Sequence, residues 1–402
     1  MSIKLEAKTF FSDGFTIIEL LVVIVVISVL AAITVISYIG VTQKSTDALL
    51  KSSLASASKQ IDLFQVVNGY YPMTIWCGIE DTLINKCINS NSEISYGYTV
   101  DDNINPQAFV LTATKNGTSY KITENSSPVP IAQKTCPVGF IVVPGSLTYG
   151  TSDFCVMKYE AKMASATVPI SQASGFPWVS ISQVDAIAYS QNVSGCISCH
   201  LISEDEWLTI AQNLLNVASN WSMGIVGSGY IYSGHDDNVP ANSLEASLDD
   251  NDGYFGTGDV FPSNQKRTLT LSNGEIIWDL PGNIYEWTSG TIAVDKQPGK
   301  IDDTLYYWRE WNDSLLVFGS LPNSTLPWYG VPAYKNWTSV NGVGEIYSKY
   351  NAAVAGPHGF LRGGRWNTAA GVNPKASGVM SLALDRLTTY VNAGMGFRVA
   401  AP

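Results

Sequence analysis

Hydrophobic residues are concentrated in one segment near the N-terminus. Between residues 15 and 42 the only charged side chain is Glu19, and residues 20–27 are all Leu, Val or Ile. About 20 consecutive apolar residues are enough to cross the hydrocarbon core of a bilayer. Lys4 and Lys8 precede the segment, so the positive-inside rule places the N-terminus in the cytoplasm and the rest outside. The pattern predicts a membrane helix rather than a cleaved secretory signal, whose apolar region is shorter.

The helical pattern continues beyond the membrane segment. Apolar residues recur at roughly helical spacing as far as Phe64, and neither Pro nor Gly occurs within residues 41–68. The turn residues Gly69 and Pro72 then end the pattern. We therefore expect one helix over residues 15–67, whose second half needs a globular head to cover its apolar face.

Short segments with strand-like patterns follow this helix. Residues 108–114 and 119–123 lie on either side of an Asn-Gly step, which favours a β-hairpin. Residues 68–124 are therefore expected to form a small β head. Residues 125–132 are polar and contain proline, which is typical of a linker. The remaining residues, 133–402, are expected to form a second domain.

This second domain interleaves glycines, aromatic residues and short apolar stretches. Two helices are expected, over residues 184–191 and 203–218. The second starts with Ser203 and Glu206, the pattern of a capping box. The rest predicts short strands joined by long ordered loops, and loops of that length in a compact domain usually have a function. The fold class expected for the whole chain is α+β.

Composition and charge exclude some function classes. Of the 402 residues, 46% are hydrophobic and only 14% are charged, which is the opposite of a disordered chain. Acidic side chains outnumber basic ones by 34 to 23, giving a formal net charge of −11. Nucleic-acid binding requires a basic surface that neutralises phosphates, so no nucleic-acid partner is expected.

The cysteines indicate an oxidising compartment. There are six of them, all beyond the membrane segment, and an even number in that position is typical of disulfides. Sequence does not fix the connectivity, and we favour pairing between neighbours. The pairs would be Cys77–Cys87, Cys136–Cys155 and Cys196–Cys199. The alternative for the last pair is half of a zinc site, although no second pair has matching spacing.

The start of the apolar segment, Gly14-Phe15-Thr16-Ile17-Ile18-Glu19-Leu20, resembles the type IV prepilin signature. The resemblance implies that a prepilin peptidase removes residues 1–14 as a leader and methylates the new N-terminus at Phe15. Independently, a carboxylate in a bilayer segment is costly and marks function by default. We expect Glu19 to pair with the α-amino group of Phe15 on a neighbouring subunit during assembly. The competing interpretation is a plain membrane anchor.

Motifs in the second domain resemble, in order and spacing, the formylglycine-generating-enzyme (sulfatase-modifying-factor) fold, which is C-type-lectin-like. They include Cys136-Pro137-Val138-Gly139-Phe140, Trp278-Asp279-Leu280-Pro281-Gly282-Asn283, Leu361-Arg362-Gly363-Gly364-Arg365-Trp366 and Gly396-Phe397-Arg398. The resemblance implies a mixed α+β domain rich in ordered loops.

The catalytic groups of that enzyme family are missing. Its oxidases use two cysteines near the C-terminus, whereas Cys199 is the last cysteine here. The related sulfoxide synthases use a His-rich iron site. This chain has only His200, His235 and His358, without an i, i+4 pair, and we expect each to be structural. The sequence therefore predicts a protein that is not an enzyme.

Residues 361–402 resemble the variable region of proteins that diversity-generating retroelements diversify. In that family, mutagenesis randomises ligand-facing positions while scaffold positions stay fixed. The resemblance implies ligand contacts at Arg365, Asn367, Thr368, Ala383, Asp385, Arg386, Tyr390, Asn392 and Gly394. Tyr and Arg are also the residue types most often found as interface hot spots. The competing interpretation is an ordinary surface loop.

Acidic residues gather between positions 236 and 259. Calcium favours clustered carboxylates on loops, so a structural calcium ion is one interpretation of Asp236, Asp237, Asp249 and Asp252. A solvated loop is the other, because Gly253 arrives one position too early for an EF-hand. No other cofactor is expected.

Together these features predict a type IV pilin-like subunit that carries a ligand-binding domain. It would be inserted in the cytoplasmic membrane as a prepilin and then displayed on an extracellular filament. The expected partners are other pilin subunits, the prepilin peptidase, and a protein or glycan ligand involved in adhesion or recognition. The large second domain favours a minor or tip subunit. The alternatives are a surface-tethered enzyme of the formylglycine-generating or sulfoxide-synthase type, and a secretion-system pseudopilin.

Overall fold

The computed structural model describes most of the chain beyond the expected membrane segment. The described residues are 44–75, 77, 81–88, 94–101, 107–115, 118–124, 126–131, 134–300, 307–314, 316–348, 356–368 and 376–402. The expected leader and membrane segment lie outside these ranges, as do Gly14, Phe15 and Glu19. Among the described residues, the structure contains no helix with the length and apolarity that crossing a membrane requires.

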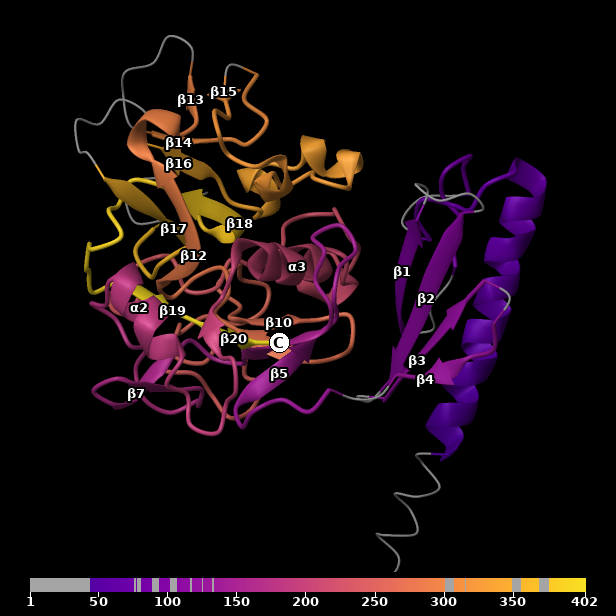
Figure 1. Ribbon diagram of the computed structural model, residues 1–402, viewed down its shortest axis with the longest axis horizontal. Helices are drawn as coiled ribbons and strands as arrows, with labels where there is room; N and C mark the ends of the chain where they lie inside the picture. The colour runs from indigo at the N-terminus through magenta and orange to yellow at the C-terminus, as the bar shows by residue number, and fades with distance from the viewer. Residues whose placement is uncertain are drawn as a thin grey trace, which may run out of the picture.

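The N-terminal part is a helix packed on a small sheet. Residues 44–68 are helical, and the sheet has the strand order β1-β2-β3-β4. Figure 1 shows the helix lying along one face of this sheet. The strands are β1 (Ser95–Asp101), β2 (Ala108–Lys115), β3 (Thr118–Thr123) and β4 (Val129–Pro130). The helix ends at Gly69, which has a φ of 81° and donates its N–H to the Gln65 carbonyl.

The core of this head is formed between the buried face of the helix and the buried face of the sheet. Leu50, Leu54 and Ile61 form a fully buried stripe on the helix, and the alternate residues Phe109 and Leu111 of β2 are buried against it. The β2–β3 hairpin forms as expected from the sequence. β4 lies within residues 125–132, so the segment expected to be a linker adds a short strand to the head sheet.

The C-terminal part contains two helices and many short strands. Its first half holds β5 (Phe140–Val143), β6 (Phe154–Met157), β7 (Lys162–Ser165), β8 (Val168–Ile170), α2 (Gln183–Ser190), β9 (His200–Leu201), α3 (Glu204–Leu215), β10 (Thr268–Thr270) and β11 (Ile276–Trp278). Its second half holds β12 (Tyr285–Ala293), β13 (Gly299–Lys300), β14 (Tyr307–Arg309), β15 (Leu316–Val317), β16 (Ile346–Ser348), β17 (Pro357–Gly363), β18 (Gly378–Ala383), β19 (Met395–Phe397) and β20 (Val399–Ala401). Long loops join these elements, so the expected α+β class is confirmed.

Two sheets share the end of the chain. The larger has the order β14-β16-β18-β17-β12-β19, and the smaller has the order β5-β6-β20-β9. β19 pairs in parallel with β12, and one residue later β20 pairs antiparallel with β6 and β9. The chain therefore passes from one sheet to the other at Arg398, and this residue fixes how the two sheets are joined.

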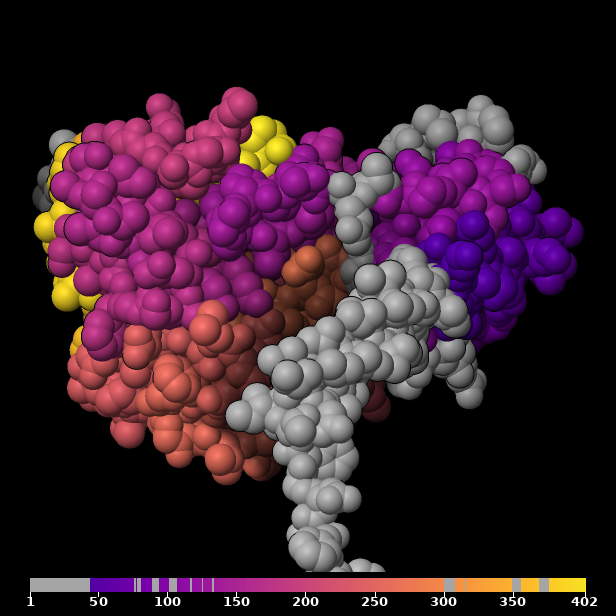
Figure 2. All heavy atoms as spheres, turned by 90° about the horizontal axis from the view of Figure 1, so that it is seen from below, coloured from indigo at the N-terminus to yellow at the C-terminus, as the bar shows by residue number. Residues whose placement is uncertain are grey.

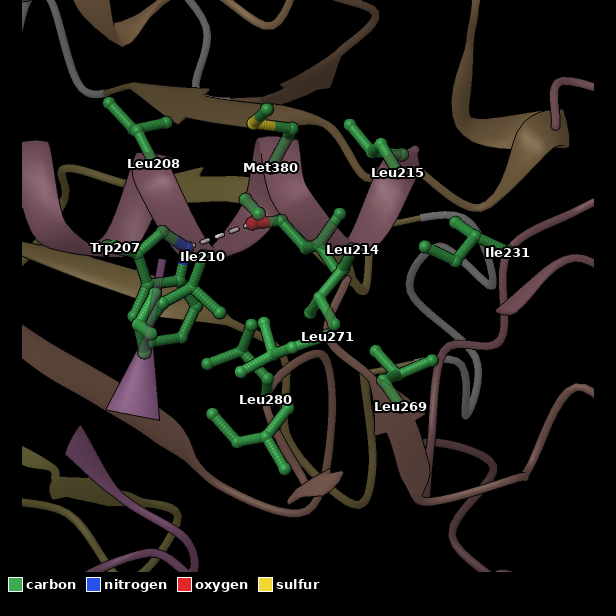
Figure 3. Close-up of a cluster of buried hydrophobic side chains, with 14 of the residues drawn as sticks. Trp207, Leu208, Ile210, Leu214, Leu215, Ile231, Leu269, Leu271, Leu280 and Met380 are labelled. Atoms are coloured by element: carbon green, nitrogen blue, oxygen red, sulfur yellow. Dashed lines mark hydrogen bonds between the residues drawn. The ribbon is translucent and has the colours of Figure 1, made fainter. Parts of the chain in front are cut away.

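The main core lies under α3. Ser203 caps this helix, and Glu206 completes a capping box, as the sequence predicted. One face of α3 buries Trp207, Leu208, Ile210, Leu214 and Leu215 against loops and β18 (Figure 3). Burial of each aliphatic side chain contributes about 1.5–3 kcal/mol. The Trp207 indole also donates to the Val379 carbonyl at 2.9 Å, which fixes α3 on β18.

Buried arginines join the elements of this part. Arg398 pairs with Glu286 at 2.7 Å, and both side chains are fully buried. Arg398 also donates to the carbonyl oxygens of Met157 and Trp278, each at 2.8 Å. Arg267 pairs in the same way with Asp279, and Arg362 with Glu204. A buried ion pair is tolerated because hydrogen bonds replace the water that each group loses.

All six cysteines are paired in disulfides. The structure contains Cys77–Cys87, Cys136–Cys155 and Cys196–Cys199, which are the neighbour pairs favoured from the sequence. The structure therefore has no free thiol. Because Cys196 and Cys199 form a disulfide with each other, the structure contradicts the alternative that they are half of a zinc site.

Removing the buried cation should destabilise the C-terminal part strongly. Arg398→Met leaves the Glu286 carboxylate buried without a partner, and we expect the free energy of unfolding to fall by about 3–5 kcal/mol. Urea unfolding of the purified full chain in detergent, followed by tryptophan fluorescence, measures this change. Lys296→Met is the matched control, because Lys296 pairs with Asp295 in an exposed position. An equal effect of the two substitutions would contradict the role of Arg398.

Candidate ligand-binding site

Tyr285 is the centre of the candidate site. It is the first residue of β12, where Gly363 of β17 is its partner on one side and Met395 of β19 on the other. Two separate strands of the expected variable segment are thus paired with the backbone of Tyr285. Burial is the main cause that raises the pKa of the Tyr285 phenol, which stays protonated at neutral pH.

Arg365 and Thr368 contact Tyr285 from the end of β17. The Arg365 guanidinium lies 6.0 Å from the centre of the Tyr285 ring, and its Nη1 donates to Asn392 Oδ1 at 3.3 Å. The Thr368 hydroxyl lies 3.5 Å from the Tyr285 hydroxyl and accepts the Arg365 backbone N–H. Thr368 is buried, whereas Arg365 and Asn392 are half-buried. The turn after β17 therefore holds Arg365 over the ring.

Gly394 completes this group from the opposite side. Its carbonyl accepts the Tyr285 backbone N–H at 2.9 Å, and its own N–H donates to Asn392 Oδ1. A Cβ atom at position 394 would lie 2.9 Å from Arg365 Cδ. Any side chain there has to displace Arg365, so positions 394 and 365 are sterically coupled.

Asp385, Arg386 and Tyr390 form a second group on the turn after β18. Arg386 Nε lies 2.9 Å from Asp385 Oδ2, and the guanidinium lies 4.6 Å from the centre of the Tyr390 ring. Asp385 also raises the pKa of Tyr285, while Arg365 lowers it, so both charges act on the same phenol. The two groups are also neighbours along the chain, because Tyr390 lies two residues before Asn392, which accepts the hydrogen bond from Arg365.

The two remaining predicted positions, Ala383 and Asn367, do not belong to either group. Ala383 is buried and is the strand partner of Leu361 and Tyr347, so its side chain belongs to the core beneath the surface. Asn367 is half-buried, and its Oδ1 atom has no hydrogen-bond partner. The structure thus brings Arg365, Thr368, Asn392 and Gly394 together around Tyr285. Asp385, Arg386 and Tyr390 form a neighbouring group, and Ala383 lies in the core.

Sequence reasoning missed the aromatic residues next to this group. Trp308 stacks on Tyr285 with ring centres 6.4 Å apart, and Tyr347 lies 5.2 Å from Trp308. Both are half-buried. They come from β14 and β16, outside the motifs that carry the family resemblance. No local signal in the sequence marks them, because only the pairing of β16 with β18 brings them to the site.

The acidic residues proposed for calcium do not converge. Asp236 is buried, and its carboxylate accepts from Gln265 Nε2 at 2.7 Å. Asp237 and Asp249 instead accept backbone N–H groups of their own loops. In the described part of the chain, no three His, Cys, Asp or Glu side chains form a group that could hold a metal. Calcium binding stays a prediction without a defined site.

The histidines have structural surroundings. His200 Nε2 lies 2.9 Å from Glu206, and this hydrogen bond raises the pKa of His200. His235 is fully buried and contacts the Asn242 carbonyl at 3.0 Å, while burial lowers its pKa. His358 is also buried, on β17. These three side chains lie on separate elements and contact different partners.

The N-terminal segment matches a family model. Residues 12–35 match the model described as the prokaryotic N-terminal methylation motif. The match includes Gly14, Phe15 and Glu19, and the prediction of a prepilin-type N-terminus is confirmed. No curated protein sequence matches the chain significantly.

The chain is also distantly similar to solved structures of Major Tropism Determinant variants. The U1 and P3c variants each give a TM-score of 0.32 at 14% identity, and the match covers 78% of this chain and 73% of theirs. The I1 variant gives a TM-score of 0.28 over the same shares. TM-scores of this size do not establish a common fold, so no conclusion about fold or function follows from them.

Stability should depend on pH through Asp236, which lies beneath this surface. Burial raises its pKa to about 7 in the folded chain, against about 3.9 in an unfolded chain. The neutral carboxyl therefore favours folding below pH 4, and this contribution is lost as pH rises through about 7. We expect Asp236→Asn to raise the melting temperature more at pH 8 than at pH 4.5.

Thermal unfolding of the full chain in detergent at both pH values measures this difference. Asp237→Asn is the matched control, because Asp237 is only half-buried and its Oδ1 accepts the backbone N–H of Val239. A gain for Asp236→Asn that is the same at both pH values would contradict the prediction.

Proposed function

We propose that this protein is a type IV pilin-like subunit, displayed at the cell surface, whose C-terminal part recognises a ligand through the surface around Tyr285. The observation that carries the proposal is the combination of the methylation motif at residues 12–35 with the pairing of Gly363 and Met395 on either side of Tyr285. The proposal also includes a lectin-like fold with diversified ligand-facing positions, which the sequence motifs of the C-terminal domain support.

The geometry supports a recognition surface. Rigid strands carry the core positions, while Arg365, Arg386, Tyr390 and Asn392 project from turns at their ends and remain half-buried. A preformed surface of this kind loses little conformational entropy on binding. Side chains on such turns can change without refolding the strands, which is what a surface that adapts to different ligands requires.

We propose a binding role rather than an enzymatic one. The oxidase chemistry of formylglycine-generating enzymes needs reactive thiols, whereas every cysteine of this chain lies in a disulfide. The histidines are on separate elements, which supports no His-rich iron site. A secretion-system pseudopilin is the second candidate, because the same N-terminal motif would serve it equally.

Processing and assembly provide a direct test of the pilin-like part. In the native host, the mature protein should begin at Phe15 with one methyl group on its α-amino nitrogen, and Gly14→Val should keep residues 1–14. Intact mass measurement of the membrane-extracted protein distinguishes these states. Ser12→Ala is the control and should be processed normally. Normal cleavage of the Gly14→Val variant would contradict the proposal.

Display can be followed in the same strains. Glu19→Ala should be processed and remain in the membrane, but its C-terminal part should disappear from sheared surface filaments, because the partner of the Phe15 amine is lost. Immunoblots of membrane and sheared fractions measure the distribution. Equal amounts of Glu19→Ala and unmodified chain in the sheared fraction would exclude assembly through Glu19. Absence of the unmodified chain from that fraction would favour the pseudopilin.

A further inference from the structure

Arg365 stands out among the arginines of the C-terminal part. Arg267, Arg362, Arg386 and Arg398 each form an ion pair with a carboxylate. The side chain of Arg365 instead contacts an amide oxygen of Asn392 and the ring of Tyr285. None of the described carboxylates pairs with it. In a chain with a net charge of −11, a cation on the candidate site without a carboxylate partner among the described residues requires an explanation.

The surroundings of Arg365 would strengthen its interaction with an anion. The stacked rings of Tyr285 and Trp308, with Tyr347 beside them, form an apolar border next to the guanidinium. Charge-assisted hydrogen bonds gain strength where water is partly excluded. Asn392 accepts a hydrogen bond from the guanidinium, and the missing side chain of Gly394 leaves room for Arg365. The side chain is therefore already ordered, and little conformational entropy is lost when an anion binds.

Exposed aliphatic residues extend this surface on the other side. Val391 is 50% exposed, directly after Tyr390, and Val184 of α2 is 52% exposed. The backbone N–H groups of Gln183 and Val184 donate to the Thr388 carbonyl, so α2 begins against the turn that carries Tyr390. Figure 2 shows the C-terminal segment (yellow) reaching the surface beside the region that contains α2 (magenta).

The aliphatic border distinguishes between two classes of ligand. Valine side chains form no hydrogen bonds with sugar hydroxyl groups, so they add little to glycan binding. Against a protein, the same side chains gain free energy by burying apolar area. Aromatic residues and arginine at the centre of an apolar border are typical of the hot spots of protein interfaces.

We propose that this surface binds a partner protein through an Asp or Glu side chain that docks on Arg365. The rings of Trp308 and Tyr347 then cover the apolar part of that side chain and its neighbours. Val184 and Val391 contact apolar residues of the partner at the border. This inference rests on the proposed function and adds the chemistry of the ligand to it.

A random peptide library displayed on phage provides the probe. The purified full chain in detergent is used for selection, and enriched peptides are expected to contain Asp or Glu next to an aliphatic or aromatic residue. A synthetic peptide of the enriched sequence should bind Arg365→Gln at least about tenfold more weakly than the unmodified chain, because a charge-assisted hydrogen bond is lost. Raising the salt concentration should weaken binding to the unmodified chain.

Further controls test whether the loss of binding is specific to the Arg365 cation. Lys121→Gln removes an exposed cation from the head and should leave peptide binding unchanged. Replacing the acidic residue of the peptide by its amide should weaken binding to the unmodified chain, but not further to Arg365→Gln. Circular dichroism confirms that each variant is folded, and Arg365→Lys, which retains the charge, should recover part of the affinity.

The outcomes separate this inference from the proposed function. Enriched peptides without acidic residues, or equal binding to Arg365→Gln, would overturn the acidic-ligand inference while the recognition surface stands. Binding to an acidic glycan array in the absence of any enriched peptide would overturn it in favour of a glycan ligand. Failure of both peptides and glycans to bind would overturn the recognition function itself.

Discussion

The buried pair of Arg398 and Glu286 is the interaction on which the C-terminal part depends. Glu286 lies on β12, between β17 and β19 of the larger sheet, and Arg398 lies at the point where the chain passes to the smaller sheet. The guanidinium also binds carbonyl oxygens of β6 and β11, so one side chain joins these two strands and β12 to the junction of β19 and β20. Because both charges are fully buried, moving these strands apart would break the ion pair and leave each charge without a partner in the apolar interior.

The same pair fixes the candidate site. Tyr285 directly precedes Glu286, and the 392–395 turn lies three residues before Arg398, so both are held by the parallel pairing of β12 with β19. The main-chain position of the ring and of Gly394 is thus set by the core. The side chains of Arg365 and Asn392 are only half-buried and belong to none of the hydrophobic clusters, whereas Tyr390 packs against the edge of the cluster that contains Tyr285.

Local patterns in the sequence were sufficient to predict several helices and strands. They did not predict which distant strands pair with each other. The capping box at Ser203 and the hairpin around the Asn-Gly step depend on neighbouring residues only, and both are found in the structure. The strand at Val129 was not expected, because a two-residue strand forms only when the edge of β3 is available. Trp308 and Tyr347 were missed for the same reason, since their place at the site depends on β16 pairing with β18.

The N-terminal and C-terminal parts of the chain have separate hydrophobic cores. The helix of residues 44–68 is buried by β1 to β3 and by Tyr71 and Ile88. Among the described residues, this hydrophobic cluster shares no residue with the clusters beneath the Tyr285 surface. A substitution at Arg365 or Tyr390 therefore changes no contact within the head core. Since effects of distant sites without shared partners are nearly additive, substitutions on the Tyr285 surface leave the packing of the helix unaffected. The two parts of the chain can therefore vary independently of each other.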